Sequence, residues 1–162
     1  MLLSIPFKGA WTAGQYVHVR FMGLDGFANR AQSHPFSIVN APRSSEKDDS
    51  PQEIQLVIRI KQGITLTLAQ HILSRSSDVP ASCALKVSIE GPYGSAPAPA
   101  AEEYRDLILF AGGSGVTHPA SVLDGLLSRV DKGEVGTESI KLFWAVQHLG
   151  QSTFLSRIVF SS

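Results

Sequence analysis

Short runs of β-branched and aromatic residues alternate with turn-forming segments in the first half of the chain. The runs cover residues 2–7, 15–21, 34–40, 54–60 and 85–91. Turn residues separate them, as in KGAWTAG and GLDG. Alternation is clearest around Leu56, Ile58 and Ile60, which are expected to share one face of a strand. Several short strands at this spacing predict a small antiparallel barrel or sandwich.

One helix is expected within this β-rich half. Its apolar positions are Leu68, Ile72 and Leu73. Thr65 or Thr67 can cap its start, because a hydroxyl can accept a hydrogen bond from a free N–H group of the first turn.

The pattern changes after the small-residue segment SAPAPAAEE (95–103), which predicts a linker. Residues 106–113 and 139–146 predict buried strands, and residues 116–130 predict a helix between them. The apolar stripe of this helix consists of Val122, Leu123, Leu126, Leu127 and Val130. Strand, helix and strand at this spacing form a βαβ unit with parallel strands. The fold class expected is therefore an antiparallel β-barrel over residues 1–98, followed by part of a Rossmann-like α/β domain over residues 99–162.

Composition narrows the classes of function. The 162 residues carry no formal net charge, which argues against nucleic-acid binding because a binder usually has a basic face. The single cysteine, Cys83, excludes an internal disulfide and fits a reducing compartment. The chain shows neither a signal peptide nor an apolar stretch of about 18–20 residues that could span a bilayer. The chain by itself is expected to be soluble.

The sequence AGGSGVT (111–117) carries the clearest local chemistry. A buried strand leads to Gly112, Gly113 and Gly115, and a helix follows. Glycine lets the backbone approach a phosphate, and the helix N-terminus offers free N–H groups. The spacing departs from the common dinucleotide motif, since His118 stands where a third glycine is expected. By itself this turn fits a plain tight turn as well as a nucleotide site.

Five ordered motifs together resemble a known family. HPFSI, GITLTL, GPYG, LFAGGSGVTHP and LFWAV resemble the flavin and nicotinamide region of the ferric reductase and NADPH oxidase family, above all its fungal ferric-chelate reductase branch. The sequence is more distantly similar to ferredoxin–NADP reductase. The resemblance covers nearly the whole chain, from the WTAGQYVHVRF segment to LFWAV.

The resemblance implies a set of cofactor-binding residues. In the FAD-binding part they are His34, Pro35, Phe36, Ser37, Ile38, Gly63, Thr65, Gly91, Tyr93 and Gly94. Those expected to meet the nicotinamide dinucleotide are Gly112, Gly113, Ser114, Gly115 and Thr117. Ser37 is the candidate catalytic residue, because the matching hydroxyl in the family lies near the flavin N5. Backbone groups around Phe36 and Ile38 are expected to hold the ring edge, and Gly63 and Thr65 to sit at the FAD pyrophosphate. No metal ligand is expected.

The implied activity is hydride transfer from NADPH to FAD, with NADH not excluded, followed by electron transfer to ferric iron or copper. In a full-length parent the electrons pass through haem held by a membrane domain. The implied localisation is a membrane-associated protein with this region facing the cytosol, and this chain alone is expected to be cytoplasmic.

The sequence also departs from the family. By comparison with the family, the chain is expected to lack the haem-binding helices and the later part of the nucleotide domain, and its barrel is expected to begin late, with the first strand open to question. Gln147 and His148 follow the strand that ends at Val146, where the family often has a basic residue, which weakens the case for NADP over NAD. A non-catalytic FAD-binding or regulatory fragment is therefore a second interpretation, and a small β-barrel ligand or nucleic-acid module is a third.

Overall fold

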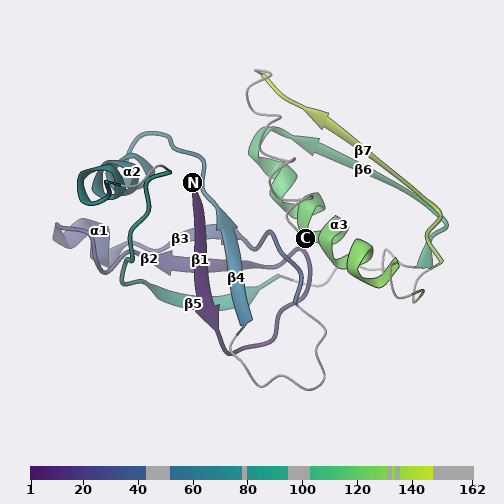
Figure 1. Cartoon of the computed structure of the whole chain (residues 1–162), viewed down its shortest axis with the longest axis horizontal. Coiled ribbons are helices and arrows are strands. Elements are labelled where there is room, and N and C mark those ends of the chain that lie inside the picture. The colour runs from purple at the N-terminus through teal and green to yellow at the C-terminus, as the bar shows by residue number, and fades with distance from the viewer. Residues whose placement is uncertain (43–51, 78–79, 95–102, 131–132, 134–135, 148–162) are drawn as a thin grey trace.

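The computed structural model describes residues 1–42, 52–77, 80–94, 103–130, 133 and 136–147. Its strands are β1 (Leu2–Phe7), β2 (Tyr16–Arg20), β3 (His34–Ser37), β4 (Gln52–Val57), β5 (Ser88–Tyr93), β6 (Asp106–Gly112) and β7 (Ser139–Ala145). Its α-helices are α1 (Phe27–Ala31), α2 (Ile64–Arg75) and α3 (Thr117–Val130), as Figure 1 shows. No helix in the described part of the chain has the length and apolar character needed to cross a membrane. The predicted linker falls outside the described residues except for Glu103.

The first five strands form the antiparallel unit that the alternating pattern predicts. β1 pairs with β4, and β2 lies between β3 and β5. A bridge between Ile38 and Leu56, together with the hydrogen bond from Val39 N to the Gln55 carbonyl oxygen at 2.9 Å, joins the two sheets. The spatial order is therefore β1-β4-β3-β2-β5, and the strands curve around one core. Between the described strands no pairing of β5 with β1 closes the ring.

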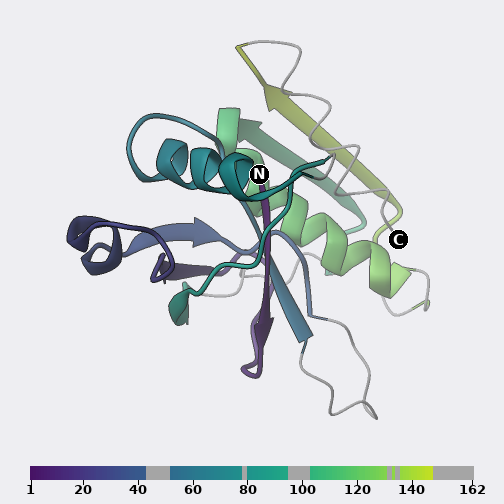
Figure 2. The same cartoon turned by 60° about the vertical axis from the view of Figure 1, so that its left-hand side comes forward.

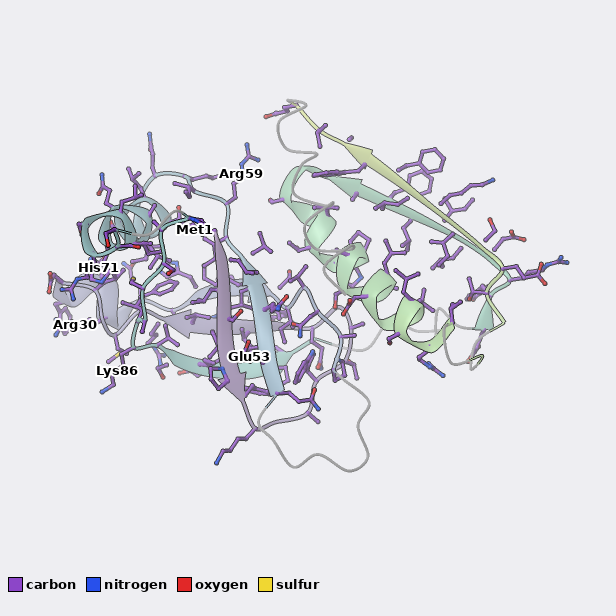
Figure 3. The ribbon with its side chains drawn as sticks, in the orientation of Figure 1. Met1, Arg30, Glu53, Arg59, His71 and Lys86 are labelled. Atoms are coloured by element: carbon purple, nitrogen blue, oxygen red, sulfur yellow. The ribbon has the colours of Figure 1, made fainter. Side chains whose placement is uncertain are left out.

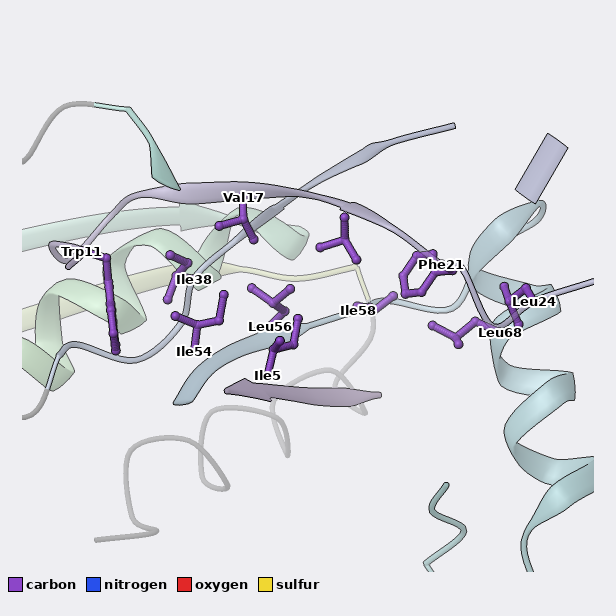
Figure 4. Close-up of a cluster of buried hydrophobic side chains, with 11 residues drawn as sticks. Ile5, Trp11, Val17, Phe21, Leu24, Ile38, Ile54, Leu56, Ile58 and Leu68 are labelled. Atoms are coloured by element: carbon purple, nitrogen blue, oxygen red, sulfur yellow. The ribbon is translucent and has the colours of Figure 1, made fainter. Parts of the chain in front are cut away.

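Inward-facing side chains of these strands make the core of this unit (Figure 4). Val17 and Val19 of β2 and Ile54 and Leu56 of β4 are fully buried, because period-two alternation points them to one face. Trp11 is also buried, and its indole N–H donates to the Asn40 carbonyl oxygen at 3.0 Å. The predicted shared face extends to Ile58, one residue beyond the end of β4, but not to Ile60, which is half exposed.

Two helical predictions need correction. Neither threonine caps α2, because Gly63 occupies the N-cap position and no side chain there bonds to a free N–H group. Thr65 Oγ1 instead accepts a hydrogen bond from Lys61 N at 2.8 Å, outside the helix. The short helix α1 was not expected, since its five residues are too few for a periodic pattern to show.

The second unit is a parallel βαβ element, as predicted. β6 and β7 pair in parallel from Asp106–Ser139 to Gly112–Ala145, and α3 connects them across one face. Figure 2 shows α3 lying along the sheet, between it and the strands of the first unit. The stripe of α3 is buried at Val122, Leu123 and Leu126, but Leu127 and Val130 near the end of the helix are exposed.

The prediction that both strands of this unit are buried is wrong for one face. Ile108, Phe110 and Phe143 are exposed, Phe110 to 75%. The rings of Phe110 and Phe143 stack with their centroids 5.3 Å apart. A parallel sheet is normally covered on both faces, whereas α3 covers only one face of this two-stranded sheet.

Helix α3 is attached to the first unit by side chains that accept backbone hydrogen bonds. Gly14 N donates to Ser121 Oγ at 3.1 Å, and Ala41 N donates to Asp124 Oδ2 at 2.7 Å. Ser121 is fully buried and both bonds are partly buried, so they satisfy polar groups that water reaches only in part. Gly125 completes the contact, since a Cβ at this position would lie 3.3 Å from the Cβ of Ala41. The helix is thereby fixed against the turn before β2 and the residues after β3.

We expect Asp124→Ala to lower the free energy of unfolding by about 1–3 kcal/mol, because it leaves the partly buried Ala41 N–H group without its acceptor. Asp124→Asn is the matched control, since its amide oxygen can still accept the bond, and it should lose less than half as much. Urea unfolding followed by circular dichroism measures both. Equal losses in the two variants would show that the hydrogen bond does not hold the units together.

Candidate functional site

The outer face of the three-stranded sheet brings together residues from the HPFSI and GPYG motifs. Tyr16 of β2 is paired with Ser37 on one side and with Tyr93 on the other. Gln15 Nε2 donates to the Gly94 carbonyl oxygen at 2.8 Å, which ties the end of the GPYG turn to the same strand. Ser37 and Tyr93 therefore lie on the two sides of Tyr16, with Gly94 close to Gln15, although more than 50 residues separate Ser37 from the GPYG motif in the sequence.

Three rings form a cluster on this face. The ring centroids of Tyr16 and His18 are 5.8 Å apart, and those of His18 and Tyr93 are 5.6 Å apart. Tyr16 and Tyr93 remain partly exposed, so the cluster presents an aromatic surface next to the Ser37 position. Sequence reasoning gave His18 no functional weight. The signal available was the alternation in YVHVR, which places Tyr16 and His18 on the same face.

The pleat of β3 divides the predicted flavin-contacting residues between two faces. Pro35 and Ser37 lie opposite His18 and Tyr16, whereas His34 and Phe36 lie opposite the buried Val19 and Val17. One flat ligand cannot contact all four side chains from one face of the sheet. Pro35 is accommodated because β3 itself pairs with β2 alone among the described strands, and the bridge to β4 is made by Ile38 after β3 ends, so a missing N–H donor at Pro35 costs little.

Two residues of the HPFSI motif differ in whether their polar groups are available to a ligand. Ile38 is fully buried, and its N–H group donates to the Gln15 carbonyl oxygen at 2.9 Å, so this N–H is already engaged. His34 Nε2 is buried and makes no hydrogen bond to any described residue. An unsatisfied buried nitrogen costs about 1–3 kcal/mol, which makes His34 a candidate for contact with a bound group.

The start of α2 provides free backbone donors at the predicted pyrophosphate position. Gly63 has φ +73°, a conformation that suits glycine, and a Cβ built there meets no described atom within 4 Å. Its carbonyl oxygen accepts from Leu66 N and Thr67 N at 3.0 and 3.1 Å. The N–H groups of Ile64 and Thr65 have no partner within the helix, because they lie in its first turn.

The glycine loop follows β6 as a 3-10 turn, Gly113–Val116, before α3 begins at Thr117. This turn separates β6 from α3, so the α-helix does not begin directly after the strand. Gly113 has φ +51°, and Cβ atoms built at Gly112, Gly113 and Gly115 would meet no described atom within 4 Å. Trp144 Nε1 donates to the Gly113 carbonyl oxygen at 2.9 Å and fixes the loop. His118 Nδ1 lies 3.4 Å from the Gly14 carbonyl oxygen, so His118 contacts the first unit.

The glycine loop faces the end of β4 across two adjoining cavities. The first has about 260 Å³ and is lined by Met1, Val57, Ile58, Arg59, Ile60, Gly113, Ser114, Val116, Thr117 and Trp144. The second has about 480 Å³ and is lined by Arg59, Lys61, Gly112, Gly113, Ser114, Ala145, Val146 and Gln147. We call the two cavities together the crevice. In Figure 3, Arg59 lies on the side of the first unit that faces α3 and β6.

The predicted residues thus fall into separate places. Gly112, Gly113, Ser114 and Thr117 line the crevice, and His34–Ile38, Gly63 and Tyr93 line neither cavity. Sequence reasoning missed Arg59, Lys61 and Trp144 as crevice residues.

Met1 also lines the crevice. Burial lowers the pKa of its amino group, which donates to the Ile58 carbonyl oxygen at 2.9 Å. Within the described ranges no cluster of His, Cys, Asp or Glu could hold a metal ion.

Comparison with known proteins agrees with this two-unit arrangement. A sequence profile described as "FAD-binding domain" matches residues 3–97, and one described as "Ferric reductase NAD binding domain" matches residues 104–159. The chain belongs to the ferric reductase family.

Curated members of this family extend well beyond the chain. The probable cell surface ferric reductase kap2 of Aspergillus oryzae is 29% identical over 146 residues, which are 88% of this chain and 18% of that protein. Ferric reductase transmembrane component 4 of Saccharomyces cerevisiae is 34% identical over 116 residues, 70% of this chain and 14% of that protein. The chain thus spans less than a fifth of the length of these relatives.

Solved structures support the fold of this ferric reductase family chain. Ferredoxin-NADP+ reductase from Plasmodium falciparum superposes with a TM-score of 0.57 at 14% identity, covering 97% of this chain and 58% of that one. The flavohem-like FAD/NAD binding domain of nitric oxide dioxygenase from Vibrio cholerae gives 0.54 at 13% identity, covering 98% and 65%. The predicted ferredoxin reductase-like fold class is therefore confirmed.

We expect Trp144→Phe to speed amide hydrogen exchange in Gly113–Val116, because the variant keeps a ring in place but loses the donor to the Gly113 carbonyl oxygen. Trp11→Phe is the matched control, since Trp11 also donates to a carbonyl oxygen but lies in the core of the first unit. Both variants should lose about 1 kcal/mol of stability. Unchanged exchange at the loop in Trp144→Phe would contradict the role of this indole.

Proposed function

We propose that the chain is the flavin- and nicotinamide-binding electron-transfer region of a ferric reductase, in which FAD receives hydride from NADPH and passes electrons onward. Residues 1–98 would bind FAD, and residues 99–162 would bind part of the nicotinamide nucleotide. The observation that carries the proposal is the crevice, in which an open glycine loop at the start of a βαβ unit faces two basic residues of the antiparallel unit.

The described residues fit FAD in three respects. The free N–H groups of Ile64 and Thr65 beside the open Gly63 position suit the pyrophosphate, and the unsatisfied His34 nitrogen suits a polar group of the cofactor. The outer face around Ser37, Pro35 and Tyr93 offers a hydroxyl beside aromatic surface for the flavin ring. When bound, flavin supplies the conversion between two-electron hydride transfer and single-electron transfer.

The described residues also fit a nicotinamide dinucleotide. Gly112, Gly113 and Gly115 leave open space in which a phosphate can approach the backbone. All the predicted nucleotide-binding residues except Gly115 line the crevice. Among the described residues that line the two cavities there is no carboxylate, so none of them is specific for the ribose diol of NADH. We therefore favour NADPH, with NADH as the alternative.

The names of the relatives indicate the acceptor to which the electrons pass from the flavin. Ferric/cupric reductase transmembrane component 2 and related ferric reductases suggest ferric iron or copper as the final acceptor. We propose that electrons reach it through haem in a membrane domain of a longer protein, and that this region faces the cytosol.

A second candidate is a non-catalytic FAD-binding or regulatory fragment. The exposed face of β6 and β7 favours it, because Phe110 and Phe143 are uncovered on a parallel sheet whose described part is covered by α3 on the other face alone.

The decisive experiment combines flavin and hydride-transfer measurements on the purified chain. FAD should bind at micromolar concentrations and colour the protein yellow, and NADPH should then reduce ferricyanide through it. Absence of FAD binding would overturn the proposal. FAD binding without any NADPH-dependent reduction would favour the non-catalytic fragment instead.

We expect Ser37→Ala to retain most of its FAD affinity but to transfer hydride several-fold more slowly, because one hydrogen bond to the flavin contributes about 1 kcal/mol. Stopped-flow flavin reduction by NADPH measures the rate. Ser4→Ala on the exposed side of β1 makes the same chemical change away from this face and should leave the rate unchanged. A normal rate in Ser37→Ala would remove this hydroxyl from the mechanism.

A further inference from the structure

One turn before β2 contacts both regions in which cofactor-binding residues are predicted. It consists of residues 12–15, and we call it the bridging turn. Gly14 of this turn contacts α3, the helix that follows the glycine loop. The next residue, Gln15, contacts the HPFSI and GPYG motifs, which we call the flavin-side motifs.

Both backbone polar groups of Gly14 lie against the beginning of α3. Its N–H group donates to the buried Ser121 Oγ at 3.1 Å, and its carbonyl oxygen lies 3.4 Å from His118 Nδ1. Gly14 has φ +87°, and a Cβ added there would lie 2.6 Å from His118 Cε1. A side chain at this position would therefore displace the imidazole ring, so the contact depends on glycine.

His118 occupies the position at which the common dinucleotide motif has its third glycine. In that motif the glycine allows the helix to pack closely on its own sheet. Here the side chain is exposed on one side and contacts the first unit on the other. The residue that departs from the motif is thus a residue that joins the two units.

Gln15 contacts the two flavin-side motifs through separate groups. Its Nε2 donates to the Gly94 carbonyl oxygen at 2.8 Å, and its backbone carbonyl oxygen accepts from Ile38 N at 2.9 Å. The side-chain oxygen Oε1 accepts from Thr12 N at 2.9 Å. Both ends of the amide are therefore engaged, and a single orientation of the amide satisfies both partners.

The contacts form a continuous path between the glycine loop and the flavin-side motifs. Helix α3 begins directly after the loop, and its beginning holds Gly14. One peptide bond further along the turn, Gln15 holds both motifs. Hydride transfer requires reacting atoms about 3–3.5 Å apart, so the relative position of two cofactors that are bound by different units decides the rate.

We propose that the bridging turn positions the two cofactors for hydride transfer, with Gln15 and His118 as its positioning residues. This inference rests on the proposed function and extends it to residues that line neither cavity of the crevice. Gln15 fixes the GPYG end, and His118 fixes the beginning of α3, so the glycine loop keeps one position relative to the flavin-side motifs. Neither side chain exchanges a proton or an electron in this role.

The first test compares two changes of an amide to a carboxylate within the first unit. Gln15→Glu keeps an oxygen that accepts a backbone N–H but loses the donor to the Gly94 carbonyl oxygen. Asn40→Asp is the matched control, because Asn40 likewise accepts from Gln55 N and donates to the Glu53 carbonyl oxygen, and both partners lie in β4. Both variants should lower the midpoint of urea unfolding to a similar extent.

Stopped-flow reduction of the FAD-saturated chain by NADPH separates positioning from affinity. In Gln15→Glu the limiting rate should fall about three- to tenfold, while the dissociation constant for NADPH changes by less than about twofold, because alignment is lost but the binding groups remain. The long-wavelength charge-transfer absorbance of the nicotinamide–flavin pair should fall with the rate. Asn40→Asp should keep the wild-type rate and absorbance.

His118 is tested by loss and rescue. His118→Ala should slow flavin reduction as Gln15→Glu does, and His118→Asn should restore most of the rate, since its amide nitrogen can donate to the Gly14 carbonyl oxygen in place of Nδ1. The double variant Gln15→Glu/His118→Ala should be no slower than the slower single variant, because both changes interrupt one path.

A measurement without nicotinamide tests the path itself. FAD binding to the wild-type chain should slow amide hydrogen exchange in Gly113–Val116, because ordering of the flavin-side motifs is passed through the bridging turn to α3. Gln15→Glu and His118→Ala should lose this effect of FAD, and Asn40→Asp should retain it.

Three outcomes would overturn the inference while leaving the proposed function intact. In the first, Gln15→Glu and His118→Ala are reduced at the wild-type rate. In the second, Asn40→Asp is slowed as much as they are, so that the effect follows stability alone. In the third, exchange in Gly113–Val116 of the wild-type chain does not respond to FAD. A wild-type chain that binds no FAD, or that NADPH does not reduce, would reject the proposed function and the inference together.

Discussion

Everything at the crevice depends on two hydrogen bonds that α3 accepts from the backbone of the first unit. Ser121 and Asp124 satisfy N–H groups of Gly14 and Ala41, and in doing so they fix the direction in which α3 leaves the glycine loop. Side-chain acceptors for backbone donors have strict geometry, unlike apolar contacts, which tolerate sliding. The width of the space between Gly113 and Arg59 is therefore set by contacts in the first half and the middle of α3.

The residues that the sequence motifs predict as cofactor-binding lie on two different surfaces of the structure. The sheet face at Ser37, Tyr16 and Tyr93 is aromatic and lies away from the cavities. The crevice combines glycine backbone, two cations and an apolar wall. Such a division suits chemistry carried by cofactors, because the protein's task is then to bind and orient them rather than to provide an acid and a base. This agrees with the described lining of the crevice, which includes no carboxylate that could act as an acid or base.

Much of the architecture could be predicted from local pattern. Alternation identified the strands, and strand, helix and glycine turn in sequence identified the βαβ unit, because these features depend on period and turn chemistry alone. Arg59, Lys61 and Trp144 could not be assigned in this way, since their roles arise only when two units meet. The exposure of Phe110 was missed for a related reason: an apolar run shows that a strand can be buried, not that a second layer covers it. The cofactor roles of Ser37 and His34 remain predictions.

The positions of the two tryptophans have an optical consequence. Trp11 is enclosed in the core of the first unit, whereas Trp144 lines the apolar cavity and bonds to the glycine loop. The intrinsic fluorescence of the chain thus combines one emitter insulated from ligands with one at the crevice. Emission that changes on nucleotide binding should come from Trp144, and the Trp11 contribution supplies a constant internal reference, so occupancy can be followed without a label.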